Sequence, residues 1–360
     1  MMPTKEMPMD TTKRLLLDQC ARYPELHVQD LLKFLHQSVF GCGHFVDAEG
    51  GGLEFLRREA AECRDAGGPE PLDGGFVRFP LGLLAKTGLK AETLWRLFLL
   101  SAKRPRGTVE ALEEKLSALL ALAEEGALPF STSEVETAIA QWRAGGFPAQ
   151  HHSDAFRAAY APAYRVIWAD YEWMLPLLCA IDRKMASGKP ILVALEGGSA
   201  AGKTTLASSL QEIYGCPVFH MDDFFLRPEQ RTAKRLAQPG GNVDHERFWE
   251  EVLRPLRAGE AVTFRRYDCH TQTLHKPISV PPAPLAVVEG AYSCHPALYD
   301  AYDLRVFLRI SPQTQRRRIQ RRNTPDFQQR FFDVWIPMEQ RYQDAFDIPN
   351  RCDLILEAIT

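Results

Sequence analysis

A glycine-rich stretch at residues 197–205 carries the residue types that bind phosphate groups. It follows the pattern G-x-x-x-x-G-K-[ST], in which small residues let backbone N–H groups surround phosphate oxygens. Lys203 supplies a point charge for the terminal phosphates, and Thr204 supplies a hydroxyl that can ligate Mg²⁺. The stretch therefore predicts a nucleoside-triphosphate site formed by Gly197, Gly198, Ser199, Ala200, Ala201, Gly202, Lys203, Thr204 and Thr205.

Two acidic residues follow apolar runs that could be neighbouring strands. Asp222 comes after the run 217–220, and Glu289 comes after the run 285–288. At the carboxyl ends of parallel strands both would face the phosphate loop. Asp222 could deprotonate an attacking hydroxyl, and Glu289 could hold Mg²⁺ or its water shell. We predict Lys203 and Asp222 as catalytic residues, and Thr204, Asp222 and Glu289 as the Mg²⁺ ligands.

A group of arginines follows the next apolar run, at residues 304–308. On a helix, Arg317 and Arg321 share one face, and Arg318 and Arg322 share another. Repulsion among these cations is easier to explain if phosphate groups lie nearby. We predict that the four arginines form a lid over the nucleotide. The alternative is a solvated helix face or a patch that binds RNA.

The elements that must position these residues alternate along the C-terminal half of the chain. Short apolar runs are separated by stretches with helical patterns, at 192–195, 217–220, 285–288, 304–308 and 353–356. This alternation favours an α/β fold, a P-loop NTPase parallel sheet with flanking helices, over residues 187–360.

Residues 1–186 are predicted to form a mainly α-helical domain. Apolar residues recur at helical spacing, and Ser133 with Glu136 forms a capping-box pattern. A short strand is expected at 76–79. The expected helices include 28–39, 109–120, a segment from 133 to the glycines at 145–146, and a long helix from 162 to 185 that Pro176 kinks.

Two clusters in this N-terminal half supply side chains that could form a site: His36, Cys42, His44, His151 and His152. Histidine and cysteine in this number suffice for a metal site. A second possibility is a small-molecule or phosphate site that uses Arg157 and Arg165. A third is purely structural use, with His152 or Ser153 as a helix cap. Spacing along the chain does not show whether the clusters meet.

Composition narrows the class of protein. The chain has 360 residues, a formal net charge of -3 and eight cysteines, with no C-x-x-C pair. This balance does not call for a nucleic acid or a membrane as a partner. The first residues lack an apolar signal segment, and no run of about 18 apolar residues occurs. We expect a cytoplasmic protein with reduced thiols, and its oligomeric state is left open.

The C-terminal motifs together resemble the uridine kinase, nicotinamide riboside kinase and phosphoribulokinase group of P-loop kinases. The resemblance covers about residues 190–356 and rests on the phosphate loop, Asp222-Asp223-Phe224-Phe225, Asp244-His245 with Phe248, Tyr267-Asp268, Glu289-Gly290 and Arg317-Arg318-Ile319. The N-terminal half loosely resembles the extra domain that precedes the kinase in some bacterial uridine-kinase-like proteins, and that domain brings no known activity with it.

The resemblance implies a kinase that uses Mg²⁺ and transfers the γ-phosphoryl group of ATP or GTP to a hydroxyl of a nucleoside or related ribosyl compound. Asp222 would be the base for a 5′-hydroxyl, Asp244 would hold ribose hydroxyls, and Tyr267 would lie near the acceptor. Asp244, considered alone, is a natural helix N-cap. Gln272 stands where uridine kinases have a histidine, and the arginine that reads the pyrimidine is missing. This departure opens the acceptor to a non-nucleoside alcohol or a sugar.

Two hypotheses of a different kind from a small-molecule kinase remain. The phosphate loop could be a nucleotide-responsive switch that regulates the N-terminal domain, although the guanine-reading Asn-Lys-x-Asp element of GTPases is absent from the sequence. Alternatively, the N-terminal half could be a second enzyme that acts before or after the kinase.

Overall fold

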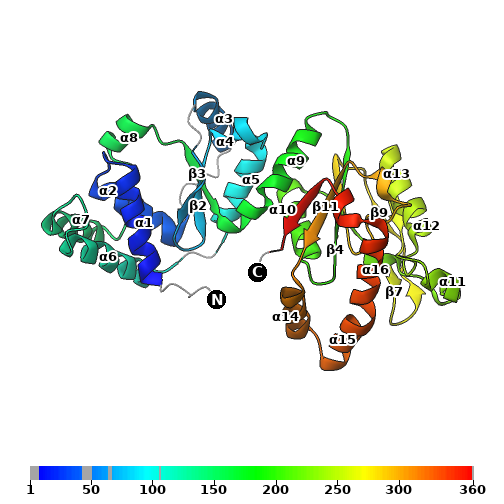
Figure 1. Cartoon of the computed structure of the whole chain (residues 1–360). Helices are drawn as coiled ribbons and strands as arrows, with labels where there is room; N and C mark the ends of the chain where they lie inside the picture. Colours follow the sequence, from blue (N-terminus) through cyan, green and yellow to red (C-terminus); the bar gives the residue numbers. More distant parts are fainter. Residues whose placement is uncertain (1–7, 43–50, 64–66, 105–106, 359–360) are drawn as a thin grey trace. The chain divides into compact units, whose positions relative to one another are not determined.

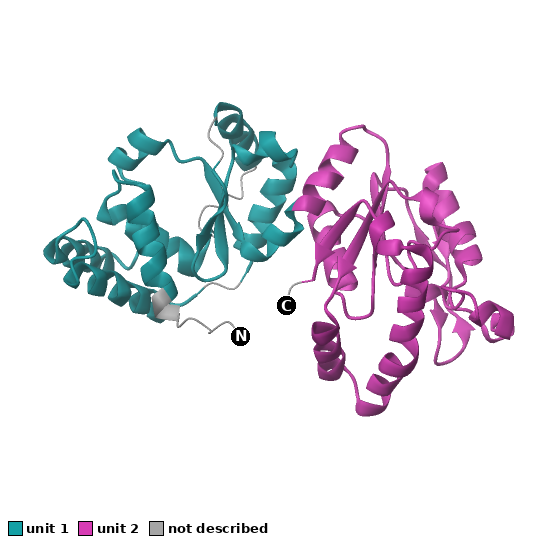
Figure 2. Cartoon of the chain, viewed as in Figure 1, with its two compact units in different colours: residues 1–175 teal, residues 176–360 magenta. Residues whose placement is uncertain are grey.

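The computed structural model describes residues 8–42, 51–63, 67–104 and 107–358 (Figure 1). The chain forms two compact units, Met1–Leu175 and Pro176–Thr360, which Figure 2 shows in different colours. Each unit has its own sheet. The N-terminal unit holds a three-stranded sheet, and the C-terminal unit holds a five-stranded one.

Helix α9 (Leu175–Met185) decides where the units divide. The predicted boundary at 186/187 assigns this helix to the N-terminal domain, whereas the compact units divide at 175/176. The Tyr214 hydroxyl, at the end of helix α10 (Lys203–Tyr214), donates to the Leu178 carbonyl at 3.4 Å and to Asp182 at 3.0 Å. These contacts join α9 to the C-terminal unit.

The large sheet is parallel throughout, with the strand order β12-β11-β4-β10-β5. Helices lie on both sides of it (Figure 1), and the predicted α/β fold is confirmed. Every residue of β4 is buried, as expected for a central parallel strand. The strands are β4 (Ile191–Gly197), β5 (Val218–His220), β10 (Leu285–Glu289), β11 (Leu304–Arg309) and β12 (Leu354–Glu357).

The remaining elements of this unit surround an aromatic core. Phe224 and Phe248 pack edge to face with ring centroids 4.8 Å apart, and both are fully buried. The helices are α11 (Ala233–Leu236), α12 (His245–Phe248), α13 (Arg254–Ala258), α14 (Pro312–Arg322), α15 (Pro325–Arg330), α16 (Ile336–Phe346) and α17 (Ile348–Arg351). Two small antiparallel pairs are β6 (Val262–Phe264) with β9 (Ile278–Val280), and β7 (Tyr267–Asp268) with β8 (Thr273–Leu274).

The N-terminal unit is mainly helical, and its sheet is antiparallel with the order β1-β2-β3. The predicted helices at 28–39 and 109–120 and the strand at 76–79 are confirmed. The elements are α1 (Pro8–Arg22), α2 (Val28–Phe40), α3 (Gly52–Glu62), β1 (Glu70–Leu72), β2 (Phe76–Pro80), α4 (Leu83–Thr87), α5 (Ala91–Ala102), α6 (Val109–Glu124), α7 (Thr132–Ala144), α8 (Asp154–Tyr160) and β3 (Tyr164–Trp168).

The long helix predicted from 162 to 185 is wrong. Residues Tyr164–Trp168 form β3, a 3-10 turn follows at Ala169–Met174, and only then does α9 begin. Val166 and Ile167 are β-branched, and they pair antiparallel with Arg78 and Val77 of β2. Tertiary pairing with a distant strand therefore overrides the local helical pattern.

The capping box of α7 lies two residues earlier than predicted. Ser131, not Ser133, has the extended backbone of an N-cap, and its hydroxyl accepts from the Glu134 N–H at 3.3 Å. Glu134 in turn accepts from the Ser131 N–H at 2.8 Å. The sequence contains two overlapping S-x-x-E patterns, and the helix starts at the first.

Candidate active site

The phosphate loop connects the end of β4 to the start of α10, and glycine is required at both ends. Gly197 has φ +147°, and a Cβ there would lie 2.6 Å from the Leu308 carbonyl oxygen of β11. Gly202 has φ +105° where α10 begins. These positive φ values are open to glycine and costly for other residues. The loop therefore places a helix N-terminus and its backbone N–H groups at the carboxyl edge of the sheet.

Side chains from other elements hold this loop in place. Lys203 is buried, and its ammonium donates to the Gly197 and Gly198 carbonyls at 2.9 and 3.0 Å. Glu339 of α16 accepts from the Ser199 N–H at 2.8 Å and from the Ser199 hydroxyl. Gln315 of α14 donates to the Ser199 carbonyl at 2.9 Å. Sequence reasoning missed Glu339 and Gln315, because no local motif marks them.

Glu196 stands directly before the loop and is fully buried. Its carboxyl group accepts from the Gly197 N–H at 2.8 Å, the Cys294 N–H at 3.0 Å and the Tyr342 hydroxyl at 3.1 Å. Burial raises the pKa of Glu196 to about 7, although these hydrogen bonds act in the opposite direction. Glu196 thus ties the end of β4 to the loop after β10 and to α16.

Glu289 lies at the end of β10, in register with Leu195 on one side and His220 on the other. Its Oε1 accepts from the Thr204 hydroxyl at 3.1 Å and lies 2.6 Å from His220 Nδ1. The hydrogen bond to Glu289 raises the pKa of His220, which favours an imidazole that donates. The carboxylate is therefore oriented towards the start of α10 by a strand neighbour.

Asp222 is positioned by a short turn, Met221–Phe224, in which both end residues are fully buried. The side chain is accessible from a cavity of about 630 Å³ that Lys203, Thr204 and Glu289 also line. Surrounding protein raises the pKa of Asp222, the nearby Lys203 charge lowers it, and the Glu289 charge raises it again. The net raised pKa makes Asp222 a stronger proton acceptor than an ordinary aspartate.

The donor set of this cavity fits Mg²⁺. Thr204, Asp222 and Glu289 offer one hydroxyl and two carboxylates, and oxygen ligands of this kind suit Mg²⁺. In the described part of the chain, no group of three or more His, Cys, Asp or Glu side chains could hold a metal ion. Mg²⁺ commonly takes one or two carboxylates and completes its shell with phosphate and water.

The arginines of α14 take different positions. Arg318 donates to the Ala200 and Ala201 carbonyls at 2.9 and 3.3 Å, so it binds the outside of the phosphate loop. Arg322 lines the cavity together with Arg330 of α15. Arg317 and Arg321 are exposed and do not line it. The lid over a bound nucleotide stays a prediction, for which Arg322 and Arg330 are the best placed.

No family model matches the sequence. The solved structures that resemble part of this chain include a possible uridine kinase from Bacillus stearothermophilus, with 20% identity over 50% of this chain and 98% of that chain and a TM-score of 0.37. A candidate fructose transport system kinase from Silicibacter sp. TM1040 has 22% identity over 46% of this chain and 89% of that chain, with a TM-score of 0.34. Shikimate kinase from Bacteroides thetaiotaomicron has 14% identity over 47% of this chain and 86% of that chain, with a TM-score of 0.25.

Each of these structures matches about half of this chain. Identities this low bear on the fold alone. The function of this chain must therefore be argued from its own site.

The three predicted acceptor-binding residues do not line the cavity. Asp244 is buried, and its carboxylate accepts from the Arg247 N–H at 3.1 Å, as the N-cap of α12, and from Gln230 at 2.8 Å. Tyr267 is buried beside Arg231, 3.4 Å from its guanidinium. Gln272 is exposed in the turn between β7 and β8, with φ +56°. Their roles in binding stay predictions.

Residues outside the phosphate loop also line the cavity. Asn242, Arg231 and Cys269 line it, together with Phe225 and Tyr292. The Asn242 Oδ1 atom is buried and has no hydrogen-bond partner among the described residues. A hydroxyl or N–H group of a ligand would satisfy this acceptor. No sequence motif marks Asn242 or Arg231.

The N-terminal cluster residues do not form a metal site within the described residues. His152 contacts Asp30 and Tyr164, His36 packs against the ring of Phe40 at 4.9 Å, and Cys42 is buried. His151 is exposed, and His44 lies outside the described residues. Ser153 caps α8 by accepting from the Phe156 N–H at 3.2 Å, as the structural reading predicted.

The predicted phosphate-binding arginines of this unit are both paired. Arg157 is exposed and pairs with Asp154 of its own helix, while Arg165 pairs with Glu59 at 2.8 Å. A phosphate site that uses both side chains would have to break these pairs.

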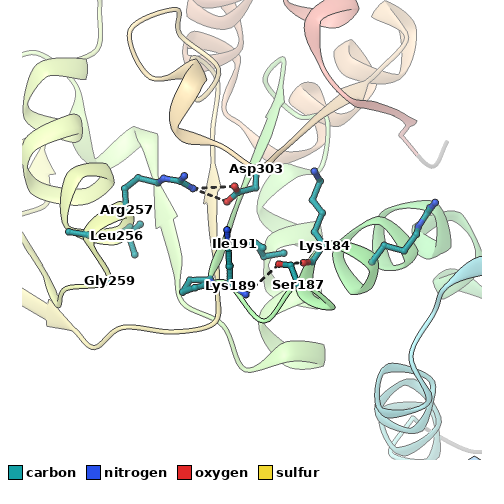
Figure 3. Close-up of a pocket in the computed structure, with 11 residues that line it drawn as sticks. Lys184, Ser187, Lys189, Ile191, Leu256, Arg257, Gly259 and Asp303 are labelled. Atoms are coloured by element: carbon teal, nitrogen blue, oxygen red, sulfur yellow. Dashed lines mark hydrogen bonds and ion pairs between the residues drawn. The ribbon is translucent and has the colours of Figure 1, made fainter.

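A second cavity of the C-terminal unit, of about 600 Å³, lies where β4 begins at Ile191 (Figure 3). It is therefore at the amino end of the parallel sheet, away from the phosphate loop. Arg257 lines it but pairs with Asp303 at 3.0 Å, and Asp303 also accepts from the Leu192 N–H at 2.8 Å. These contacts tie helix α13 to the sheet and leave no carboxylate poised for proton transfer.

No helix among the described residues is long and apolar enough to cross a membrane.

Proposed function

We propose that the C-terminal unit is a kinase that transfers the γ-phosphoryl group of a nucleoside triphosphate to the hydroxyl of a small molecule. One observation carries the proposal: Asp222, a carboxylate of raised pKa, opens onto the same cavity as Lys203 and Thr204 of the phosphate loop. A site that only binds a triphosphate needs no such proton acceptor. Phosphoryl transfer to an alcohol does, because the attacking hydroxyl must lose its proton.

The chain's own residues supply most of the chemistry. Backbone N–H groups of the loop and the Lys203 ammonium bind the phosphates, and they stabilise the negative charge that spreads over the transferring group. Asp222 orients the acceptor hydroxyl and takes its proton. Arg322 and Arg330 line the mouth of the same cavity, where they can neutralise charge and exclude water.

Thr204 and Glu289, with Asp222 nearby, would hold Mg²⁺, which when bound would supply positive charge next to the phosphate groups. His220 keeps Glu289 oriented through its 2.6 Å contact. The Thr204 hydroxyl donates to Glu289 at 3.1 Å, so these two predicted ligands are adjacent.

The acceptor is proposed by class. The sequence resemblance favours nucleosides and related ribosyl compounds, with sugars and other small alcohols as the runner-up. Cavity residues Arg231 and Asn242 offer a cation and an unsatisfied acceptor atom for such a polar molecule. ATP and GTP are both candidate donors.

The test is a screen of nucleosides, sugars and small alcohols with ATP or GTP and Mg²⁺, read by mass spectrometry of phosphorylated products. The wild-type chain should phosphorylate at least one class, and Lys203→Ala should reduce product by orders of magnitude. ATP hydrolysis that no acceptor alters would favour the alternative of a nucleotide-responsive switch acting on the N-terminal unit.

A further inference from the structure

The N-terminal unit contains a cavity of about 300 Å³ that the proposed kinase chemistry does not use. Helices α3 and α5 supply an aromatic side, with Phe55, Trp95 and Phe98. Helix α2 and strand β3 supply polar side chains, among them Lys33 and Tyr164. Small-molecule sites commonly span about 300 to 1,000 Å³ and combine apolar walls with a few polar groups.

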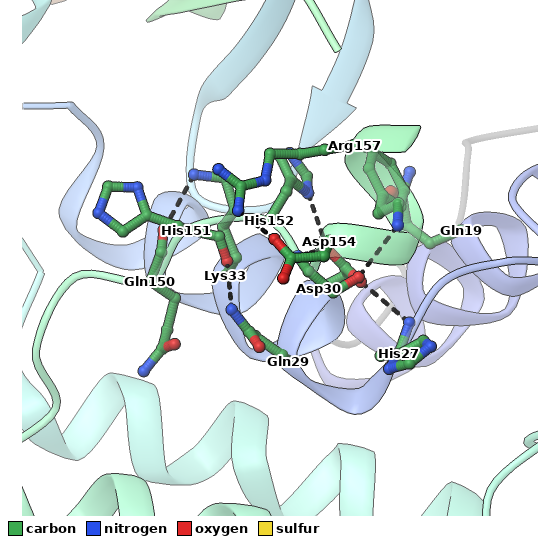
Figure 4. A network of polar contacts seen from close by, with 12 residues as sticks. Gln19, His27, Gln29, Asp30, Lys33, Gln150, His151, His152, Asp154 and Arg157 are labelled. Atoms are coloured by element: carbon green, nitrogen blue, oxygen red, sulfur yellow. Dashed lines mark hydrogen bonds and ion pairs between the residues drawn. The ribbon is translucent and has the colours of Figure 1, made fainter. Parts of the chain in front are cut away.

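A buried cation lies at the polar side. Lys33 is 6% exposed, and its ammonium donates to the Gln150 carbonyl at 3.0 Å (Figure 4). Burial and the nearby Arg78 charge lower the pKa of Lys33 to about 8. A buried ammonium is stabilised by an anion in contact with it. A negatively charged group in the cavity would therefore favour the charged form of Lys33.

A relay of hydrogen bonds fixes the polar side beside Lys33. The Asp30 carboxylate accepts from the Ser153 hydroxyl at 2.7 Å and lies 2.8 Å from His152 Nδ1, and these contacts help lower the pKa of Asp30 to about 2. Because an ionised carboxylate only accepts, His152 Nδ1 carries the proton. Burial lowers the pKa of His152 to about 4, so its Nε2 is unprotonated at neutral pH.

It follows that the Tyr164 hydroxyl donates to His152 Nε2 over 2.7 Å. The hydrogen of this hydroxyl is thus directed away from any ligand. The Tyr164 oxygen keeps lone pairs and can only accept from a ligand, while Lys33 donates to one. The cavity is lined by two cations, Lys33 and Arg165, and Arg165 is paired with Glu59 at 2.8 Å, so we take Lys33 as the donor for an anion.

The aromatic side is also built. The Trp95 and Phe98 rings are stacked with an interplanar angle of 25° and centroids 5.3 Å apart. A Cβ at Gly52 would collide with the Trp95 ring, so glycine lets this ring lie against α3. Phe55 is 56% exposed, and the guanidinium groups of Arg58 and Arg165 lie 6.0 and 5.9 Å from its ring centroid. A flat ligand ring would cover part of this surface.

We propose that this cavity binds a small planar ring that carries an anionic group, a carboxylate or a phosphate. The ring packs against Trp95 and Phe55, and the anion binds Lys33. The shared chemistry fits both a free aromatic acid and a nucleoside monophosphate, and the experiment separates the two sources. The site stands independently of the kinase proposal, since none of its residues belongs to the C-terminal unit.

The test is a titration of the full-length chain, followed by tryptophan fluorescence. The anionic probes are benzoate and uridine 5′-monophosphate, and the neutral probes are benzyl alcohol and uridine. At least one anionic probe should change the fluorescence, and it should bind about tenfold or more tightly than its neutral counterpart, as a charge-assisted hydrogen bond predicts. The probe that binds identifies the source.

Matched variants locate the binding. Trp95→Phe should remove the fluorescence change, whereas Trp335→Phe, in the phosphate-loop cavity, should keep it. Lys33→Met should weaken binding at least tenfold, and Lys86→Met, at an exposed position of α4, should not. If Lys33→Met does not fold, Gly52→Ala serves instead, because its Cβ displaces Trp95 and should weaken binding similarly.

Three outcomes would overturn the proposal. The first is that neither anionic probe alters the fluorescence. The second is that the neutral probes bind as tightly as the anionic ones. The third is that the fluorescence change persists in Trp95→Phe and disappears in Trp335→Phe, which would place the ligand in the phosphate-loop cavity.

Discussion

Asp222 is the proposed proton acceptor for the attacking hydroxyl. Its neighbour Asp223 has the same side chain but points elsewhere, towards Arg266 at 3.3 Å. The two adjacent carboxylates thus have different surroundings, since Asp222 shares a cavity with Lys203 and Asp223 does not. The pair gives a matched comparison within one turn of chain.

Asp222→Asn should lower kcat by about 10²–10⁴-fold, because an amide cannot accept the hydroxyl proton. The affinity for the metal-free nucleoside triphosphate should change little, since the phosphate loop is intact. Steady-state kinetics on the acceptor found by the screen provide the measurement. Asp223→Asn is the control and should keep near-normal turnover. Equal rates in wild type and Asp222→Asn would rule out the proposed base.

At the scale of elements, the loops after β5 and β10 must approach closely to bring Asp222 and Glu289 to one cavity. Gly290 follows Glu289 with φ +145°, and a Cβ there would lie 2.7 Å from the Met221 Cβ. Met221 directly precedes Asp222. A side chain at position 290 would therefore push one catalytic loop away from the other.

Gly290→Ala should reduce kcat at least about tenfold through displacement of Asp222, since misplacement of about 1 Å can cost 10²-fold. Gly259→Ala is the control: it has φ +72° but open space around its Cβ, so it carries backbone strain alone. Kinetics of both variants, with nucleotide affinity measured separately, check the prediction. It fails if the two variants lose the same activity.

A second junction of elements, in the N-terminal unit, is sensitive to pH. His152 is buried and joins α2 to β3 through Asp30 and Tyr164. Its pKa is lowered to about 4, below the ordinary value of about 6.5. Between pH 6.5 and pH 4, His152 binds a proton in the unfolded chain but not in the folded unit. The contribution of His152 to the free energy of unfolding is therefore present above pH 6.5 and is lost as the pH falls towards 4.

When the pH is lowered from 7 to 5, His152 alone should reduce the free energy of unfolding by about 2 kcal/mol. His152→Asn should lower stability at pH 7 and reduce the dependence on pH, because asparagine can still donate to Asp30 but does not titrate. Urea unfolding at the two pH values measures the difference. His151→Asn, the exposed neighbour, should behave like wild type. A variant at 152 that keeps the full wild-type pH dependence would contradict the assignment.

At the scale of the whole molecule, the chain is two compact units, each with its own sheet. The division at 175/176 makes α9 part of the C-terminal unit, where Leu178 and Asp182 meet Tyr214. The unit that holds the phosphate loop therefore starts before residue 187, the start predicted from the sequence.

A fragment of residues 176–360 should fold and bind nucleoside triphosphates, whereas a fragment of residues 187–360 should unfold at a temperature lower by about 5 °C or more. The reason is the loss of the α9 contacts, which include the fully buried Leu177 and Leu178. Thermal unfolding of the two fragments makes the comparison. Equal midpoints would return the boundary to 186/187.

How much the sequence alone could predict follows from the range of the physical interactions. The phosphate loop, the strands next to Asp222 and Glu289, and the parallel α/β sheet were predictable, because glycine conformations, apolar runs and helix caps act over a few residues. The order of these motifs along the chain was enough to place both carboxylates at one edge of the sheet.

Only the tertiary structure decided the rest. Glu339 and Gln315 reach Ser199 across 140 and 116 residues of chain, and the pairing of β3 with β2 turned an expected helix into a strand. Asp244 was expected at the acceptor, but its carboxylate is engaged with Arg247 and Gln230, while Asn242 faces the cavity. Such contacts join distant segments, so their outcome depends on packing that no local pattern encodes.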